Sequence, residues 1–258
     1  MRLGLVIASG DEAAAAEAEG HGLFGVLVSG TAGSECIAGA YAAAVTEFAR
    51  IIVRVHIGSE HPITLAEEVS ILDNACGGRV VVMADVSELD AGAAIEDVML
   101  LRWALSSTPI RHAGARWTVP AGLPEHKATA SVIVTPPPVQ VQVPVWVIGG
   151  PSASVSEALG VPVVRTEPGS PGVSGALIPG LVALTGNLEA DRTRVQAWAD
   201  AGVSHLLLDR SAGGSLDDVS RYLQPEVGMV RFPRVIADAA LPMEWQVTPT
   251  NTPASNGH

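Results

Sequence analysis

The sequence alternates between short apolar runs and longer helix-like segments, and this alternation limits the folds open to the chain. The expected strands are Leu3–Ile7, Gly25–Val28, Ile51–Val55, Arg79–Met83, Val145–Ile148, Val161–Val164, Leu181–Thr185 and His205–Leu208. Nearly all of their residues are apolar, which is typical of parallel strands that are covered on both faces. A doubly wound sheet and a closed barrel both satisfy this pattern, and eight strands in succession fit a (β/α)8 TIM barrel.

Helices are expected between most of these strands. Their ranges are Asp11–Gly20, Ser34–Phe48, Thr64–Cys76, Ala91–Leu105, Ser152–Leu159, Leu188–Ala201 and Leu216–Leu223. Thr64 and Glu67 have the spacing of a capping box, which predicts a helix start at Thr64. His61-Pro62 is expected to have a structural role at the same start, because proline is well tolerated in the first turn. Gly77-Gly78 is expected to end this helix.

Two parts of the chain depart from the alternation. From Ser106 to Pro144 the sequence is rich in proline, and we expect an excursion over the barrel mouth with a short extra strand at Val132–Val134. After Gln246 the residues are polar and proline-rich, which predicts a disordered tail. The expected organisation is therefore one barrel domain over residues 1–245 and a tail over 246–258.

Charge and cysteine content exclude several classes of function. The net charge is −12 and Lys127 is the only lysine, so no basic run is present to neutralise nucleic-acid phosphates. Cys36 and Cys76 are too few for a disulfide framework and form no CxxC pair for zinc, so no metal site is expected. No apolar stretch reaches membrane-spanning length, and the N-terminus is typical of a strand rather than a signal peptide. We therefore expect a cytoplasmic protein without a membrane or nucleic-acid partner.

Three segments carry a resemblance to a known family. Residues 49–80 contain His61-Pro62, Ala66-Glu67, Leu72-Asp73 and Gly77-Gly78-Arg79; residues 144–152 read Pro-Val-Trp-Val-Ile-Gly-Gly-Pro-Ser; and residues 185–209 run from Thr185-Gly186 to Asp209. Together they resemble the bacterial luciferase-like monooxygenases over most of the chain. The resemblance implies a closed barrel with an active site at the carboxyl ends of the strands, a flavin (FMN) or deazaflavin (coenzyme F420) cofactor, and a homodimer. It also implies an oxidoreductase that acts on a small organic substrate.

The candidate site residues lie at strand ends. In the family, small residues at the end of the Pro-x-Trp strand hold the cofactor phosphate, which assigns that role to Gly149, Gly150 and Ser152. Arg54 and His56 lie on the same face of their strand, since side chains alternate. Both should therefore face a polar cavity or the barrel mouth, unless buried carboxylates satisfy them.

These side chains have distinct expected roles. His56 is the candidate acid or base, Arg54 is a candidate ligand for an anionic group, and Asp85 occupies the catalytic end of its strand. For His56 the alternative is a hydrogen bond with a loop carbonyl, and for Arg54 an ion pair with a carboxylate.

Departures from the family pattern leave alternative functions open. Ala84-Asp85-Val86 stands where the family commonly has a glycine pair, and only 4% of the residues are aromatic. These features favour a non-catalytic paralogue that serves as a structural partner or ligand-binding protein, because fold alone does not imply activity. A barrel of the sugar-phosphate isomerase type is a third possibility, but it requires a glutamate or lysine at a strand end.

Overall fold

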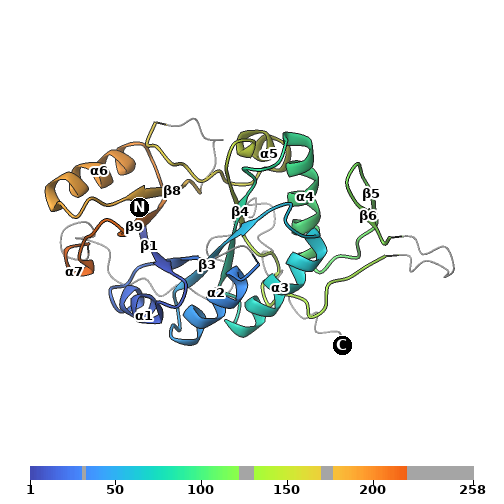
Figure 1. The fold of residues 1–258 in the computed structure, drawn as a ribbon, viewed down its shortest axis with the longest axis horizontal. Coiled ribbons are helices and arrows are strands. Elements are labelled where there is room, and N and C mark those ends of the chain that lie inside the picture. Colours follow the sequence, from blue (N-terminus) through green and yellow to red (C-terminus); the bar gives the residue numbers. More distant parts are fainter. Residues whose placement is uncertain (31–32, 122–130, 170–176, 220–258) are drawn as a thin grey trace, which may run out of the picture.

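In the computed structural model seven strands form one parallel sheet (Figure 1), and the described residues are 1–30, 33–121, 131–169 and 177–219. The strands are β1 (Arg2–Ala8), β2 (Gly25–Ser29), β3 (Arg50–His56), β4 (Val80–Asp85), β7 (Val145–Ile148), β8 (Pro179–Ala183) and β9 (His205–Asp209). Their order is β7-β4-β3-β2-β1-β9-β8. The first strand pairs with the last, with Leu3 opposite Leu206. This pairing is the one that the predicted barrel requires.

The sheet curls until its two edge strands are joined through one short segment. Val163 forms a parallel bridge with Val147 of β7, and Arg165 forms one with Gly180 of β8. The backbone N–H of Val147 donates to the carbonyl of Pro162 at 2.8 Å, and the N–H of Leu181 donates to the carbonyl of Arg165 at 2.9 Å. The predicted strand Val161–Val164 is thus reduced to isolated bridges. Pro162 contributes to this reduction because it has no N–H for a ladder.

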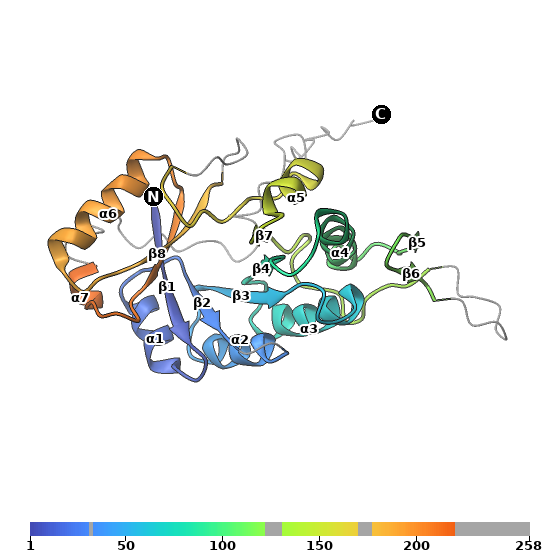
Figure 2. The same cartoon turned by 45° about the horizontal axis from the view of Figure 1, so that its top comes forward.

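The described residues include seven helices, and each follows a strand along the chain. They are α1 (Glu12–Gly20), α2 (Glu35–Ala44), α3 (Pro62–Ala75), α4 (Ala91–Ala104), α5 (Ser152–Leu159), α6 (Leu188–Asp200) and α7 (Leu216–Asp218). Figure 2 shows α1, α2 and α3 along the outer side of β1, β2 and β3. No helix in the described part of the chain is long and apolar enough to cross a bilayer.

The end of α2 and the start of α3 differ from the sequence prediction. The helix α2 stops at Ala44 instead of Phe48, because the carboxylate of Glu19 accepts hydrogen bonds from the backbone N–H groups of residues 47–49. The helix α3 begins at Pro62, where the Nδ1 atom of His61 accepts from the N–H of Ile63 at 3.1 Å. The structural role of His61-Pro62 is confirmed, and the capping box at Thr64 is wrong. Gly77 and Gly78 have φ angles of +67° and +83° and follow the end of α3, as predicted.

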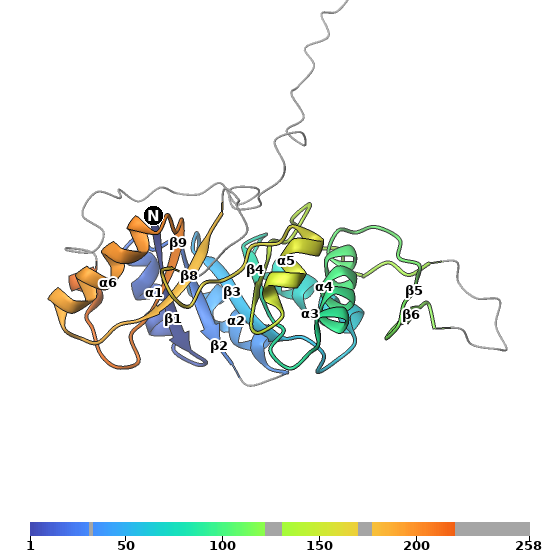
Figure 3. The same cartoon turned by 90° about the horizontal axis from the view of Figure 1, so that it is seen from above.

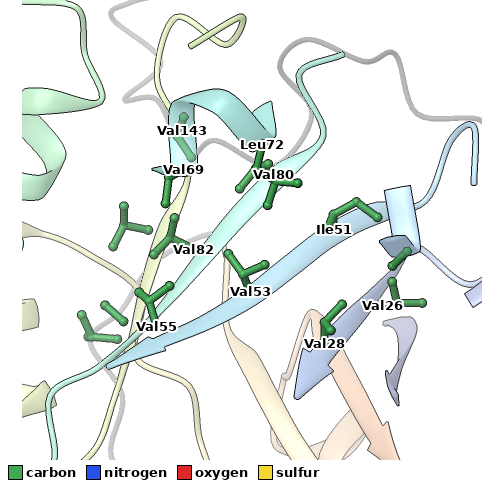
Figure 4. Packing of buried hydrophobic residues seen from close by; sticks show 14 of the residues in the cluster. Val26, Val28, Ile51, Val53, Val55, Val69, Leu72, Val80, Val82 and Val143 are labelled. Carbon is green, nitrogen blue, oxygen red and sulfur yellow. The ribbon is translucent and has the colours of Figure 1, made fainter. Parts of the chain in front are cut away.

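Buried side chains form two layers, one outside and one inside the curled sheet. On the outside, valines of the strands pack against α3 (Figure 4), including Val53 and Val82 beside Val69 and Leu72. The inner cluster comprises Phe24, Leu27, Ile52, Val81, Met83, Trp146, Ile148, Val164, Leu177 and Leu207. Because side chains alternate along a strand, Arg54, His56 and Asp85 share the inner face with Ile52 and Met83. The polar side chains therefore lie above the inner cluster at the carboxyl end.

The excursion between α4 and β7 packs outside the helices. Its hairpin, β5 (His112–Ala113) and β6 (Thr118–Val119), projects beyond α4 (Figure 3). In α4 the carboxylate of Glu96 accepts from the N–H groups of residues 115–117, and Asp97 accepts from the indole N–H of Trp117 at 2.6 Å. The prediction that this excursion covers the barrel mouth is therefore wrong for its described residues. Of Val132–Val134, only Val132 forms a bridge, with Ile110. The predicted tail 246–258 lies outside the described residues.

Candidate functional site

The predicted site residues meet at the carboxyl ends of three adjacent strands. His56 ends β3 and is opposite Asp85, which ends β4; Asp85 is opposite Ile148, which ends β7. Gly149 and Gly150 follow β7 directly. Parallel strands bring their carboxyl ends to one edge, so residues far apart in the sequence share this part of the barrel mouth.

Arg54 and Asp85 form a charge-assisted pair. The Nε and Nη2 atoms of Arg54 donate to one oxygen of Asp85 at 3.0 and 2.6 Å, and the other oxygen accepts from the N–H and hydroxyl of Ser87 at 3.0 and 2.5 Å. Burial favours the neutral form of Asp85, but the hydrogen bonds from Ser87 and Arg54 outweigh it and lower the pKa of this carboxyl. The Arg54 side chain is 40% exposed and that of Asp85 is 6% exposed. The Asp85 carboxylate therefore holds the Arg54 guanidinium in place, and part of the Arg54 side chain stays accessible.

His56 is held in the same manner by a residue that the sequence analysis missed. Its Nδ1 atom lies 2.9 Å from Oε1 of Glu35, the first residue of α2. The side chain of Glu35 is 7% exposed, whereas that of His56 is 41% exposed. The partner is a carboxylate and not the loop carbonyl considered above. A single sequence carries no signal for this contact, because it depends on how α2 packs against β3.

Further acidic groups surround Glu35. Burial, reinforced by the neighbouring carboxylates, raises the pKa of Glu60 and of Glu68. Burial and the three glutamates also raise the pKa of the Cys36 thiol to about 12. Cys36 is therefore a neutral thiol near pH 7, which excludes it as a thiolate nucleophile.

The two glycines after β7 differ in what surrounds them. Gly149 has a φ of +112°, and a Cβ atom there would lie 2.5 Å from the hydroxyl and 2.8 Å from the backbone nitrogen of Ser87. Glycine is thus required for contact between this turn and the Asp85–Ser87 loop. A Cβ on Gly150 would meet no atom within 4 Å. The N–H of Ser152 donates to the Gly149 carbonyl at 3.2 Å, and Ser152 is buried. Gly150 is consequently the open position of the turn.

The loops after β8 and β9 form a second, smaller feature at this end of the barrel. A pocket of about 20 Å³ lies between them, lined by Gly186, Asp191, Gly214, Ser215 and Asp218 among others. This volume is about enough for one water molecule, and two carboxylates line it. It does not suit a phosphate. Among the described residues, no group of three or more histidine, cysteine, aspartate or glutamate side chains is arranged to hold a metal ion.

Solved structures with the same fold include two monooxygenases and a coenzyme F420 dependent reductase. EDTA monooxygenase from Chelativorans sp. BNC1 is 14% identical with a TM-score of 0.54, and the match covers 87% of this chain and 68% of that one. Monooxygenase RslO1 from Streptomyces bottropensis is 16% identical with a TM-score of 0.52, covering 78% and 65%. The coenzyme F420 dependent tetrahydromethanopterin reductase from Methanopyrus kandleri is 15% identical with a TM-score of 0.52, covering 84% and 63%.

These matches establish the fold. The chain has the luciferase-like α/β barrel, as predicted. The barrel is shortened, and the chain spans about two thirds of the length of these proteins. No protein-family model matches the sequence. No curated protein matches it either.

Proposed function

We propose that this protein is an oxidoreductase that binds FMN or coenzyme F420 at the barrel mouth and acts on a small organic substrate. The observation that carries the proposal is the pair of accessible nitrogen groups at the carboxyl end of β3, Arg54 and His56, each held by a buried carboxylate. Groups fixed in this manner are preorganised to meet a charge or a proton in a bound ligand. Fold relationship to enzymes described as monooxygenases and as F420 dependent supports the same choice.

The residues present fit a cofactor with a planar ring and a phosphate. Gly150 has open space in front of it at the start of α5, where an anion can approach the helix N-terminus. Below the polar side chains lies a buried apolar layer that includes Met83, Ile148 and Leu207. When bound, either cofactor supplies the redox chemistry, and the protein supplies position and electrostatics.

Arg54, His56 and Ser87 have separate tasks in this proposal. The accessible part of the Arg54 guanidinium stabilises negative charge on a ligand, while Asp85 fixes its orientation. His56 accepts or donates a proton at the ring edge that is not engaged with Glu35. The hydroxyl of Ser87 already donates a hydrogen bond to Asp85, so Ser87 positions the carboxylate instead of attacking a substrate.

A non-catalytic ligand-binding barrel is the second candidate, and the charge balance favours it. Asp85 neutralises Arg54, and Glu35, Glu60 and Glu68 surround the His56 side of the mouth. An anionic cofactor gains little from a mouth without excess positive charge. This candidate predicts that neither FMN nor F420 binds.

FMN and riboflavin separate the phosphate contribution from that of the ring. We expect FMN to bind at least about tenfold more tightly than riboflavin, since the phosphate at the Gly150 turn adds about 1.4 kcal/mol or more. Quenching of flavin fluorescence measures both dissociation constants at one ionic strength. Equal dissociation constants for the two flavins would show that the phosphate contributes nothing.

A homodimer formed through α2 is part of the same proposal. The exposed residues of α2 are Ile37, Ala40, Tyr41 and Ala44, and none is charged. Ile37 and Tyr41 are 60% and 57% exposed, and Ile71 of the adjacent α3 is 57% exposed. A helix that is apolar on all sides is normally covered. A second copy is the occupant proposed, because in a chain of net charge −12 an uncharged face lets two copies meet with least repulsion.

Sedimentation velocity tests the dimer with two matched substitutions. We expect a dimer at micromolar concentration for the parent and a monomer for Ile37→Glu, because a charge buried at the interface is not compensated. Ile133→Glu alters another isoleucine that is 51% exposed but lies outside α2 and α3, and it should remain dimeric. A monomeric parent, or a dimeric Ile37→Glu variant, would contradict this interface.

The compartment proposed is the cytoplasm. Cys36 and Cys76, the cysteines of the chain, are both free thiols in the structure. Reducing compartments maintain free thiols, and this supports the proposal.

A further inference from the structure

The contact between Glu35 and His56 restricts which end of the imidazole carries the proton. Oε1 of Glu35 lies 2.9 Å from Nδ1, and the ionised carboxylate can only accept a hydrogen bond. Nδ1 must therefore carry a hydrogen in this contact. In the neutral imidazole the proton is then absent from Nε2, which becomes an acceptor.

The surroundings hold this arrangement in place. Glu35 is the first residue of α2, its side chain is 7% exposed, and it packs close to Gly30, where a Cβ would lie 3.2 Å from the Cα of Glu35. The carbonyl of His56 accepts from the hydroxyl of Ser59 at 2.7 Å, which fixes the backbone at the end of β3. In the described part of the chain Nε2 makes no hydrogen bond, and the His56 side chain is 41% exposed. The accessible nitrogen is thus an acceptor on a fixed ring.

Several carboxylates lie on the Glu35 side of this pair. Glu35 on α2, Glu60 in the loop after β3 and Glu68 on α3 interact electrostatically with one another, and Cys36 beside them is a neutral thiol. Arg54, two residues before His56, is already paired with Asp85 of β4. A positive charge formed on the ring during a transfer would lie 2.9 Å from the carboxylate of Glu35, which would compensate it.

We infer that Glu35 is a positioning residue that makes His56 a proton acceptor at Nε2, so that the site takes a ligand with a neutral hydroxyl or N–H donor in preference to an anionic oxygen. In the transfer, the proton leaves the ligand and forms a bond with the Nε2 lone pair. The ligand keeps the electron pair of the broken bond, and Glu35 compensates the imidazolium. The inference rests on the proposed function only in that the ligand binds at the barrel mouth.

The tautomer of His56 can be measured without any ligand or cofactor. In ¹⁵N NMR of the parent at a pH where His56 is neutral, we expect Nδ1 to be protonated and Nε2 to be unprotonated. Glu35→Ala removes the acceptor, and we expect the ratio of Nδ1–H to Nε2–H forms to fall by at least about tenfold, as the loss of a charge-assisted hydrogen bond implies. Glu68→Ala removes a carboxylate from the same group without touching His56, and it should leave the tautomer unchanged.

The outcomes that overturn this inference are independent of cofactor binding. A parent protein with its proton on Nε2 contradicts it directly, even if Glu35→Ala does not fold. An unchanged tautomer ratio in folded Glu35→Ala, verified by its thermal melting curve, also contradicts it. Failure to bind FMN or F420 would remove the proposed function but would leave the predicted tautomer of His56 standing.

Discussion

Gly150→Asp is expected to weaken FMN binding by at least about tenfold, a loss of about 1.4 kcal/mol. A Cβ at this position meets no atom within 4 Å, and the φ of Gly150 lies outside the left-handed region, so the turn accepts a side chain without crowding. The substitution therefore acts through its charge. An aspartate at the start of α5 would occupy the space that the phosphate needs and repel the phosphate.

Gly20→Asp is the matched control for this experiment. Gly20 ends α1, its Cβ position is equally open, and the change adds the same charge away from the proposed phosphate position. We expect the FMN dissociation constant of this variant to stay within about twofold of the parent value, since screening weakens distant charges. If Gly150→Asp binds FMN as tightly as Gly20→Asp does, the phosphate lies elsewhere.

Arg79→Met is expected to lower the free energy of unfolding by about 3–5 kcal/mol. Arg79 is 4% exposed, and its guanidinium donates to the carbonyls of Cys76, Ala49, Ala43 and Thr46 and to the Thr46 hydroxyl, at 2.8 to 3.1 Å. Methionine fills much of the volume but donates no hydrogen bond. Several buried acceptors would then lose their partner, and each unsatisfied group costs about 1–3 kcal/mol.

Arg192→Met provides the comparison on the surface. The Arg192 side chain is 49% exposed, and its ion pair with Glu189 is 3.6 Å long. Denaturant unfolding at pH 7 should give a change within about 0.5 kcal/mol for this variant, as exposed ion pairs contribute little. Similar losses for the two variants would contradict the structural role assigned to Arg79.

The strands were predictable from the sequence because the barrel imposes a simple pattern on them. Strands covered on both faces are apolar throughout, and seven of the eight predicted strands form the sheet with ends shifted by a few residues. The exception, Val161–Val164, satisfies the same pattern. The apolar pattern does not indicate how many ladder hydrogen bonds a segment can form. In Val161–Val164, Pro162 limits that number.

The misplaced helix boundaries have a different cause. The end of α2 depends on Glu19 of another helix, and the start of α3 depends on a histidine side chain used as the cap. The path of the excursion depends similarly on Glu96 and Asp97 in α4. The contacts of Glu19, Glu96 and Asp97 join residues that are distant in sequence, and local propensity carries no information on them. The His61 cap is local, but histidine is not among the residues that usually cap a helix start.

The sequence indicated where the candidate site lies but not which side chains pair with one another there. Alternation along β3 and β4 placed Arg54, His56 and Asp85 at the mouth, and the structure pairs Arg54 with Asp85. Glu35 was missed because its approach to His56 follows from the packing of α2 on β3, for which a single sequence has no signal. The assignment of Gly149, Gly150 and Ser152 to a phosphate remains a prediction.

The central claim is that a flavin or deazaflavin cofactor binds at this mouth. Fluorescence titration of FMN and of F420 with the purified protein measures this most directly. We expect a saturable change for at least one of them, with a dissociation constant in the micromolar range. No change with either cofactor at protein concentrations up to about 1 mM, an affinity of only about −4 kcal/mol, would contradict the claim and favour the non-catalytic barrel.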